Sequence, residues 1–179
     1  GTILDQGKLA TWIGKYMGII KLFAPDITIG VKEKTSYAQL YDDVCHEMAH
    51  ASHFAQVGKD WWNNFATYII TSAITPKAGL YGSGSGKGAG YCEIAEMWGY
   101  HMSSYMHVER YGGDYPLYGN SWWFYPQIFK YLMDRGFTLS EIMKAMQKDV
   151  TSRDALHTKL LDLYPSRKTV IDQVFARYY

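Results

Sequence analysis

Apolar residues recur at three- and four-residue spacing over most of the chain, which is the pattern of amphipathic helices. Residues 8–23 show it first, and Pro25 predicts the end of that helix. The branched run over residues 27–31, Ile-Thr-Ile-Gly-Val, instead predicts a short β-strand. The expected fold class is therefore mainly α (α+β), with a small or vestigial β-sheet and a C-terminal helical region.

Capping residues predict the bounds of the central helices. Ser36 with Gln39 three residues later predicts a helix that begins near Tyr37, and Gly58 predicts its end near Val57. The glycine-rich segment 79–90 is expected to be a flexible loop at the edge of a cleft. A helix is favoured over residues 60–75, although a strand over 68–71 remains an alternative. Further helices are predicted over residues 91–110, 121–135, 139–149, 152–163 and 167–178.

Length and charge bound the class of protein. The 179 residues are expected to form a single domain, and a net charge of +1 without a basic run gives no reason to expect nucleic acid as a partner. No apolar stretch reaches the roughly 18 residues of a membrane span. Because the first residue is Gly1, the chain is expected to be a trimmed or processed piece of a longer, secreted or cell-envelope protein. Cys45 and Cys92 are expected to be buried thiols rather than a disulfide framework.

The residues that carry chemistry are His46-Glu47-x-x-His50, an H-E-x-x-H sequence inside the predicted helix 37–57. Residues four apart share one helix face, so His46 and His50 can offer two imidazole nitrogens to one zinc ion. Glu47 borders that face and is placed to take a proton from a water on the metal, which predicts metal-assisted hydrolysis. A solvent-exposed helix that carries these residues by chance is disfavoured, because the neighbours of the motif are mostly apolar.

A catalytic zinc site needs a third protein ligand. His53 lies about 10 Å along the helix axis from His46 and is expected to line the cleft rather than bind the ion. The metzincin pattern would need a glycine at position 53 and a histidine at position 56, where this chain has His53 and Gln56. The spacing alone leaves Glu93 and Glu96, both in the predicted helix 91–110, as candidates.

The two motif helices resemble those of the gluzincin zinc peptidases. The segment Ala95-Glu96-Met97-Trp98-Gly99-Tyr100-His101-Met102 is similar to the Glu-x-x-Ala-x-x-aromatic helix of compact members, among them lethal-factor-type toxin proteases and small bacterial zinc peptidases. The resemblance implies Glu96 as the third ligand, with Gly99 at the small position that lets the helices approach. In thermolysin-like members an Asp holds the first histidine, where this chain has Tyr100.

The resemblance also implies roles for other residues. Tyr91, shortly before Glu96, resembles the tyrosine that stabilises the oxyanion in the toxin-type relatives, with Tyr81 and His107 as alternatives. The predicted strand 27–31 matches the edge strand that pairs with an extended peptide substrate.

The expected function is therefore a zinc-dependent metallopeptidase with one Zn2+ per chain and a peptide or protein substrate. The alternative is a binding or structural module that keeps the zinc as a staple and grips a glycan or protein partner, and a third possibility is a regulatory peptidase-like scaffold. Glu47 favours the enzyme, because a structural zinc site does not need a base.

Overall fold

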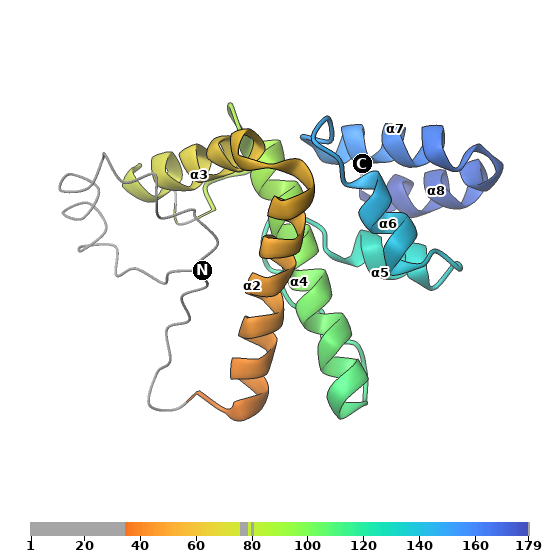
Figure 1. Cartoon of the computed structure of the whole chain (residues 1–179), viewed down its shortest axis with the longest axis horizontal. Coiled ribbons are helices and arrows are strands. Elements are labelled where there is room, and N and C mark those ends of the chain that lie inside the picture. Colours follow the sequence, from red (N-terminus) through yellow and green to blue (C-terminus); the bar gives the residue numbers. More distant parts are fainter. Residues whose placement is uncertain (1–34, 76–78, 80, 179) are drawn as a thin grey trace.

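Two long helices, α2 (Tyr37–Val57) and α4 (Ala89–Tyr111), lie side by side at the centre of the structure (Figure 1). They run antiparallel. The hydroxyl of Ser103, late in α4, donates to the carbonyl of Asp42, early in α2, whereas Trp98 Nε1 donates to Ser52 Oγ further along α2. The pair therefore brings the middle of one helix against the middle of the other.

The structure is a computed structural model that describes residues 35–75, 79 and 81–178. This part of the chain is mainly helical and contains no strand. The predicted helix 8–23 and strand 27–31 lie outside the described residues. Beyond α2 and α4, the elements are α3 (Lys59–Ile74), α5 (Gln127–Met133), α6 (Leu139–Ala145), α7 (Arg153–Leu163), η2 (Pro165–Arg167), α8 (Lys168–Phe175) and η3 (Ala176–Tyr178).

The predicted boundaries of α2 are confirmed, and α4 extends the predicted helix 91–110 by two residues at its start and one at its end. Ser36 Oγ accepts a hydrogen bond from the Gln39 amide at 3.1 Å, which caps the first turn of α2. Gly58 follows the last turn with φ 82°, and its amide donates to the Phe54 carbonyl. Segment 60–75 is helical, so the strand alternative over 68–71 is wrong.

The C-terminal helices are shorter than predicted. Residues 121–126, expected to be helical, form turns because the Trp123 indole donates to the Tyr81 carbonyl at 2.9 Å. Pro126 has no amide hydrogen and stands at the N-terminal boundary of α5. Helix α6 ends at Ala145 rather than near residue 149, and the Gln56 side chain from α2 donates to carbonyls at its end.

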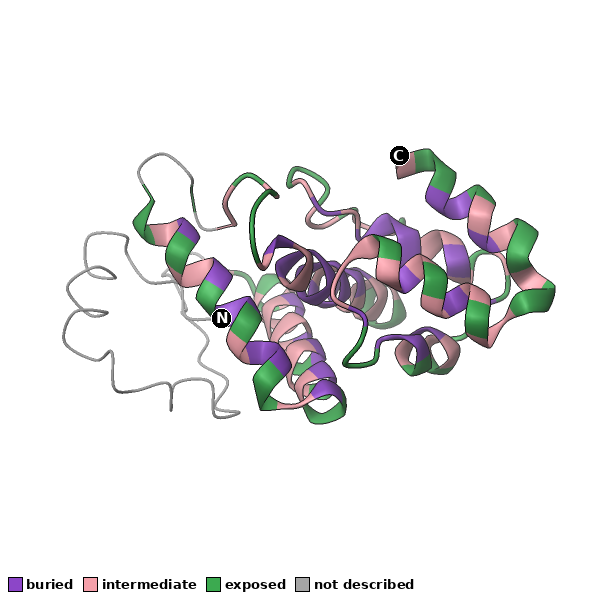
Figure 2. Ribbon diagram, turned by 90° about the horizontal axis from the view of Figure 1, so that it is seen from above, coloured by how far each residue is buried: buried purple, intermediate pink, exposed green. Residues whose placement is uncertain are grey.

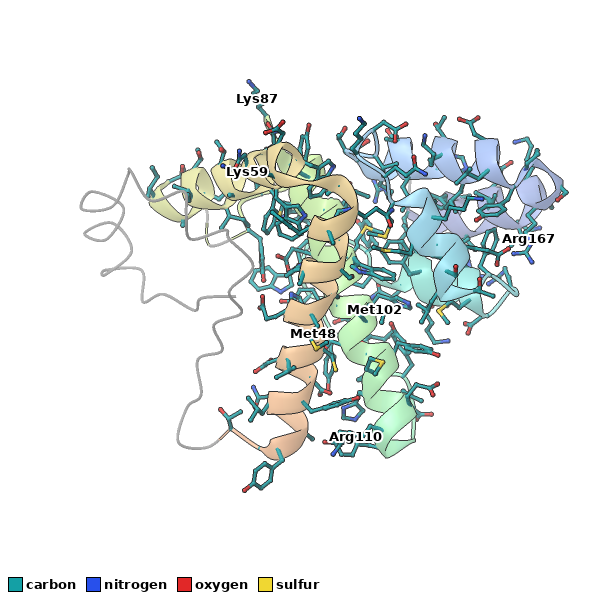
Figure 3. The ribbon with its side chains drawn as sticks, in the orientation of Figure 1. Met48, Lys59, Lys87, Met102, Arg110 and Arg167 are labelled. Carbon is teal, nitrogen blue, oxygen red and sulfur yellow. The ribbon has the colours of Figure 1, made fainter. Side chains whose placement is uncertain are left out.

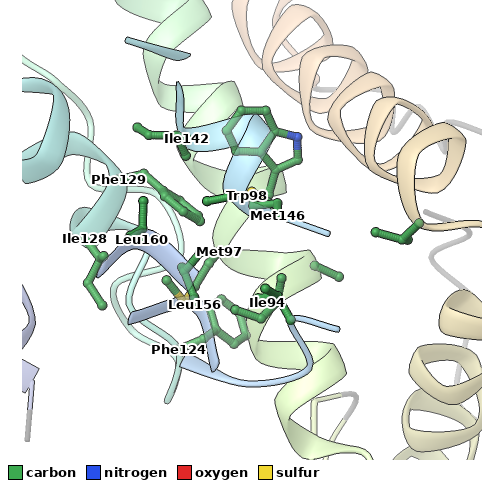
Figure 4. Packing of buried hydrophobic residues seen from close by; sticks show 14 of the residues in the cluster. Ile94, Met97, Trp98, Phe124, Ile128, Phe129, Ile142, Met146, Leu156 and Leu160 are labelled. Atoms are coloured by element: carbon green, nitrogen blue, oxygen red, sulfur yellow. The ribbon is translucent and has the colours of Figure 1, made fainter. Parts of the chain in front are cut away.

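The hydrophobic core surrounds the first half of α4, which Figure 2 shows as the most buried element. From residue 92 to residue 99 every residue of α4 is buried. On the side opposite α2, α4 packs against apolar side chains of the C-terminal region (Figure 4). The main contributors are Ile94, Met97, Trp98, Phe124, Ile128, Phe129, Ile142, Met146, Leu156 and Leu160. The C-terminal helices thus hold α4 rigidly while its other face meets α2. Within the described ranges, no helix combines the length and apolarity needed to cross a bilayer.

Candidate metal centre

The α2–α4 contact brings the three predicted metal ligands together. His46 and His50 of α2 and Glu96 of α4 each offer a ligand atom, and these atoms all lie within 4.8 Å of one another. His46 Nε2 is 3.4 Å from one carboxylate oxygen of Glu96, and His50 Nε2 is 3.6 Å from the other. The two imidazoles and the carboxylate therefore converge on one point between the helices.

The two separations between a histidine nitrogen and a carboxylate oxygen are close to those that zinc requires. Ligand atoms about 2.0–2.1 Å from a tetrahedral ion lie roughly 3.3–3.4 Å apart, close to the two observed separations. Glu96 is 3 % exposed, and its Oε2 finds no hydrogen-bond partner in the part of the chain that the structure describes. A buried carboxylate oxygen without a hydrogen bond is unfavourable, and a metal ion supplies a partner. These residues fit a metal ion.

Burial also sets the protonation state that a ligand needs. Burial of the ring, followed by the nearby His46, lowers the pKa of His50 well below its usual range. The imidazole is therefore neutral at physiological pH, and a neutral imidazole is the form that binds a metal.

Gly99 is the residue that lets the helices approach at this level. A Cβ built on it would lie 2.6 Å and 2.7 Å from Cε1 and Nε2 of His46, and 2.9 Å from Cε1 of His50. Any larger residue would push both imidazole rings away from Glu96, which lies one helical turn earlier on the same face of α4. The close contact between α4 and the two histidines thus explains why the motif needs a small residue at position 99.

The two histidines of the group are partly exposed, whereas the carboxylate is more deeply buried. The side chains of His46 and His50 are 13 % and 12 % exposed, compared with 5 % for Glu96. Glu47, the neighbour of His46, is half-buried, and Met48 is 58 % exposed. Figure 3 labels Met48, which marks the level of the metal group along α2. This partial exposure suits a site that a substrate must reach.

Two tyrosines lie beside the metal group. The ring of Tyr100 meets the ring of His46 edge to face, with centroids 4.6 Å apart. Its hydroxyl is hydrogen-bonded to that of Tyr81 at 3.2 Å. Burial and the charge of Glu96 raise the pKa of both phenols, so both keep their protons at neutral pH. The ring of Tyr100 thus packs against the predicted ligand His46, and its hydroxyl is joined to that of Tyr81.

The segment that carries Tyr81 is well anchored. The Tyr81 carbonyl accepts hydrogen bonds from the hydroxyl of Tyr68 at 3.1 Å and from the indole of Trp123 at 2.9 Å. Gly84, with φ 77°, lies so close to Trp123 that a Cβ there would come within 2.6 Å of the indole. The described residues between Gly79 and Gly88 have no regular secondary structure, as the predicted loop requires, and Tyr68 and Trp123 hold the part that carries Tyr81.

The other predicted site residues lie elsewhere. The ring of Tyr91 packs against Trp61 with centroids 5.0 Å apart, and its catalytic role stays a prediction. Glu93, the alternative third ligand, accepts a hydrogen bond from the Arg153 amide at 3.2 Å and faces the Arg153 guanidinium at 3.6 Å. Glu93 therefore ties α4 to α7, and Glu96 alone of the two joins the histidines.

His107, the other alternative oxyanion donor, belongs to a separate network. Its Nδ1 lies 3.0 Å and 2.9 Å from the two carboxylate oxygens of Asp42, and the Tyr118 hydroxyl donates to the same carboxylate at 2.7 Å. Burial and then Asp42 raise the pKa of Tyr118 to about 12. His107 is eight residues beyond Gly99, about 12 Å along the axis of α4. The sequence did not point to this network, although Asp42 lies one turn before His46 on α2.

His53 and the cysteines are core residues. His53 is 0 % exposed and its ring packs against Trp61 with centroids 4.5 Å apart, so the expectation that it lines an open cleft is wrong. Cys45 and Cys92 are free and buried, as predicted. Burial raises the pKa of both thiols, which keeps them protonated.

Comparison with known proteins gives no match: no protein-family model, no curated protein and no solved structure matches the chain. The class of the protein therefore has to be inferred from the site itself.

Proposed function

We propose that the chain is a zinc-dependent metallopeptidase of gluzincin type with a zincin-like fold. One observation carries the proposal: His46, His50 and Glu96 bring three ligand atoms within 4.8 Å of one another, with Glu47 next to His46 in the same helix. The donor set of two imidazoles and one carboxylate is that of peptidase zinc sites, which leave a fourth position open for water or substrate.

Zinc bound there would supply a Lewis acid that polarises the scissile carbonyl and makes a water molecule acidic near neutral pH. The residues of the chain perform the remaining tasks. The Glu47 carboxylate takes the proton of the attacking water and delivers it to the nitrogen of the leaving amine. The imidazoles and Glu96 fix the position at which the reaction takes place, and Gly99 keeps them close together.

Tyr100 and Tyr81 are the proposed donors to the carbonyl oxygen as it gains negative charge. Their hydroxyls are hydrogen-bonded to each other beside His46, and their raised pKa values keep them protonated. A preorganised donor of this kind lowers the barrier because it stabilises charge that develops only in the transition state. The Tyr81–Tyr100 pair therefore replaces Tyr91 as the leading candidate for this role.

Replacement of Glu47 by Gln tests the proposal. The amide keeps the shape of the side chain but cannot accept the proton, so zinc content and fold should persist while hydrolysis falls by about 10²- to 10⁴-fold. The zinc-loaded parent and the variant are incubated with a broad peptide library, and the products are read by mass spectrometry.

Two outcomes contradict the proposal. Equal cleavage by the parent and by Glu47→Gln would show that Glu47 is not the base. A parent that binds one zinc per chain and cleaves no peptide would favour the alternative, a binding module in which the zinc is a staple.

A further inference from the structure

Next to the metal ligand His50 lies a cluster of buried polar atoms that have no hydrogen-bond partners in the described part of the chain. His50 Nδ1, both ring nitrogens of His53 and Trp62 Nε1 are buried, and none has a hydrogen-bond partner among the described residues. Buried polar atoms of folded proteins are nearly always hydrogen-bonded, because each unmade bond costs about 1–3 kcal/mol. Four such atoms on three neighbouring side chains indicate a shared polar partner rather than separate defects.

The rings of His50 and His53 both pack against the indole of Trp62. Its ring lies 5.3 Å from the ring of His50 and 5.9 Å from that of His53, both edge to face. His53 follows His50 by three residues, so the two imidazoles share one face of α2. Trp61 closes the far side of His53 at 4.5 Å between ring centroids. The cluster is therefore enclosed by aromatic rings and adjoins one metal ligand.

The donors and acceptors of the cluster complement one water molecule. When His50 binds a metal through Nε2, its Nδ1 carries the proton and donates, and the Trp62 indole can only donate. Burial lowers the pKa of His53 to about 3, so its ring is neutral and one of its nitrogens accepts. A water molecule accepts two hydrogen bonds and donates two, so one water can partner His50 Nδ1, Trp62 Nε1 and the acceptor nitrogen of His53, which are three of the four atoms.

We propose that His53 is a positioning residue for the metal ligand His50, acting through a buried water that accepts from His50 Nδ1 and Trp62 Nε1 and donates to His53. The inference rests on metal binding at the proposed site but not on peptidase activity. A hydrogen bond to the second nitrogen of a ligating histidine fixes its orientation and raises its basicity, and loss of such a partner lowers metal affinity about 10–100-fold.

Zinc affinity of the full chain, measured by competition with a chromophoric chelator, tests the proposal. His53→Phe fills the space but removes both nitrogens, so zinc should bind about 10–100-fold more weakly. His53→Gln keeps an acceptor and a donor and should restore most of the affinity. Trp62→Phe removes the indole N–H together with part of the ring, and loss of that one hydrogen bond should weaken zinc binding about 2–10-fold. The matched control is His101→Phe, which replaces another fully buried histidine that is not part of the metal group.

A purely structural role for His53 predicts a different pattern. It would change the melting temperature of the metal-free protein in EDTA and leave zinc affinity within about twofold of the parent. Parental zinc affinity in His53→Phe overturns the proposal, as does an equal loss in His53→Gln and His53→Phe. Should His53→Phe fail to fold, parental affinity in Trp62→Phe overturns it instead.

The proposal and the peptidase function fail separately. A parent that binds zinc and cleaves nothing overturns the peptidase function alone, and the affinities of the variants still decide the role of His53. A parent that binds no zinc overturns both.

Discussion

Replacement of Gly99 by Ala adds a single methyl group at the closest point between α2 and α4. Its Cβ would lie 2.6–2.9 Å from atoms of His46 and His50. These separations are about 0.5–0.8 Å shorter than ordinary van der Waals contact. The imidazoles, or α4 itself, must move by about that amount. Metal sites tolerate only about 0.2 Å in ligand distances, so the three ligands can no longer meet one ion at their proper distances.

The effects on stability and on metal binding should separate. Ala is favoured over Gly inside a helix by about 1 kcal/mol, while overpacking costs about 1–3 kcal/mol. The metal-free variant should therefore lose only about 0–2 kcal/mol. Zinc affinity should fall by about 100-fold or more, the upper end of the range for disturbed ligand orientation. Chelator competition measures the affinity, and urea unfolding in EDTA measures the stability.

Gly90→Ala is the matched control on the same helix. Its Cβ would collide with the backbone of Thr151 and Ser152, away from the metal group. This variant should lose stability and keep parental zinc affinity, which is the reverse of the pattern expected for Gly99→Ala. Parental zinc affinity in Gly99→Ala would refute the proposed close approach of α4 to the two histidines.

Two further predictions concern the tyrosines and the acid limb of stability. Tyr100→Phe or Tyr81→Phe should lower kcat about 10²- to 10³-fold with zinc content unchanged. If both variants keep full activity and Tyr91→Phe loses it, the oxyanion donor is Tyr91 instead. Burial lowers the pKa of His101 to about 3, so below about pH 6.5 the unfolded chain binds a proton at this residue and the folded chain does not. The metal-free protein in EDTA should therefore lose about 1.4 kcal/mol of stability for each pH unit below about 6.5. Urea unfolding from pH 6.5 to pH 4 should show a shallower slope for His101→Phe, and an unchanged slope would contradict the neutral burial of His101.

Local signals in the sequence were sufficient for the central helices. The cap at Ser36 and the glycine at position 58 define α2 through contacts within one helical turn. The i, i+4 spacing of His46 and His50 likewise follows from helix geometry alone. Glu96 required the resemblance to a family, because nothing local distinguishes it from Glu93. The distinction is tertiary, since Glu93 turns to Arg153 on another helix.

Contacts between distant segments explain what the sequence did not predict. The helix expected over residues 121–135 begins only at α5, where the bond from Trp123 to Tyr81 and the position of Pro126 determine the backbone. Glycines predicted a loop in the segment that carries Tyr81, but they did not predict the hydrogen bonds from Tyr68 and Trp123 to its carbonyl. The pairing of Tyr81 with Tyr100 depends on that segment, so the hydroxyls beside the metal group could not be found from spacing.

X-ray absorption at the zinc edge of the zinc-loaded protein, together with a metal count, tests the metal centre most directly. We expect one zinc per chain with two imidazole nitrogens at about 2.0–2.1 Å, oxygen ligands and no sulfur. Glu96→Ala should lose a protein oxygen ligand and bind zinc weakly. A sulfur shell at about 2.3 Å, which would bring in Cys45 or Cys92, would contradict the assignment. So would a third imidazole, or an unchanged spectrum in Glu96→Ala.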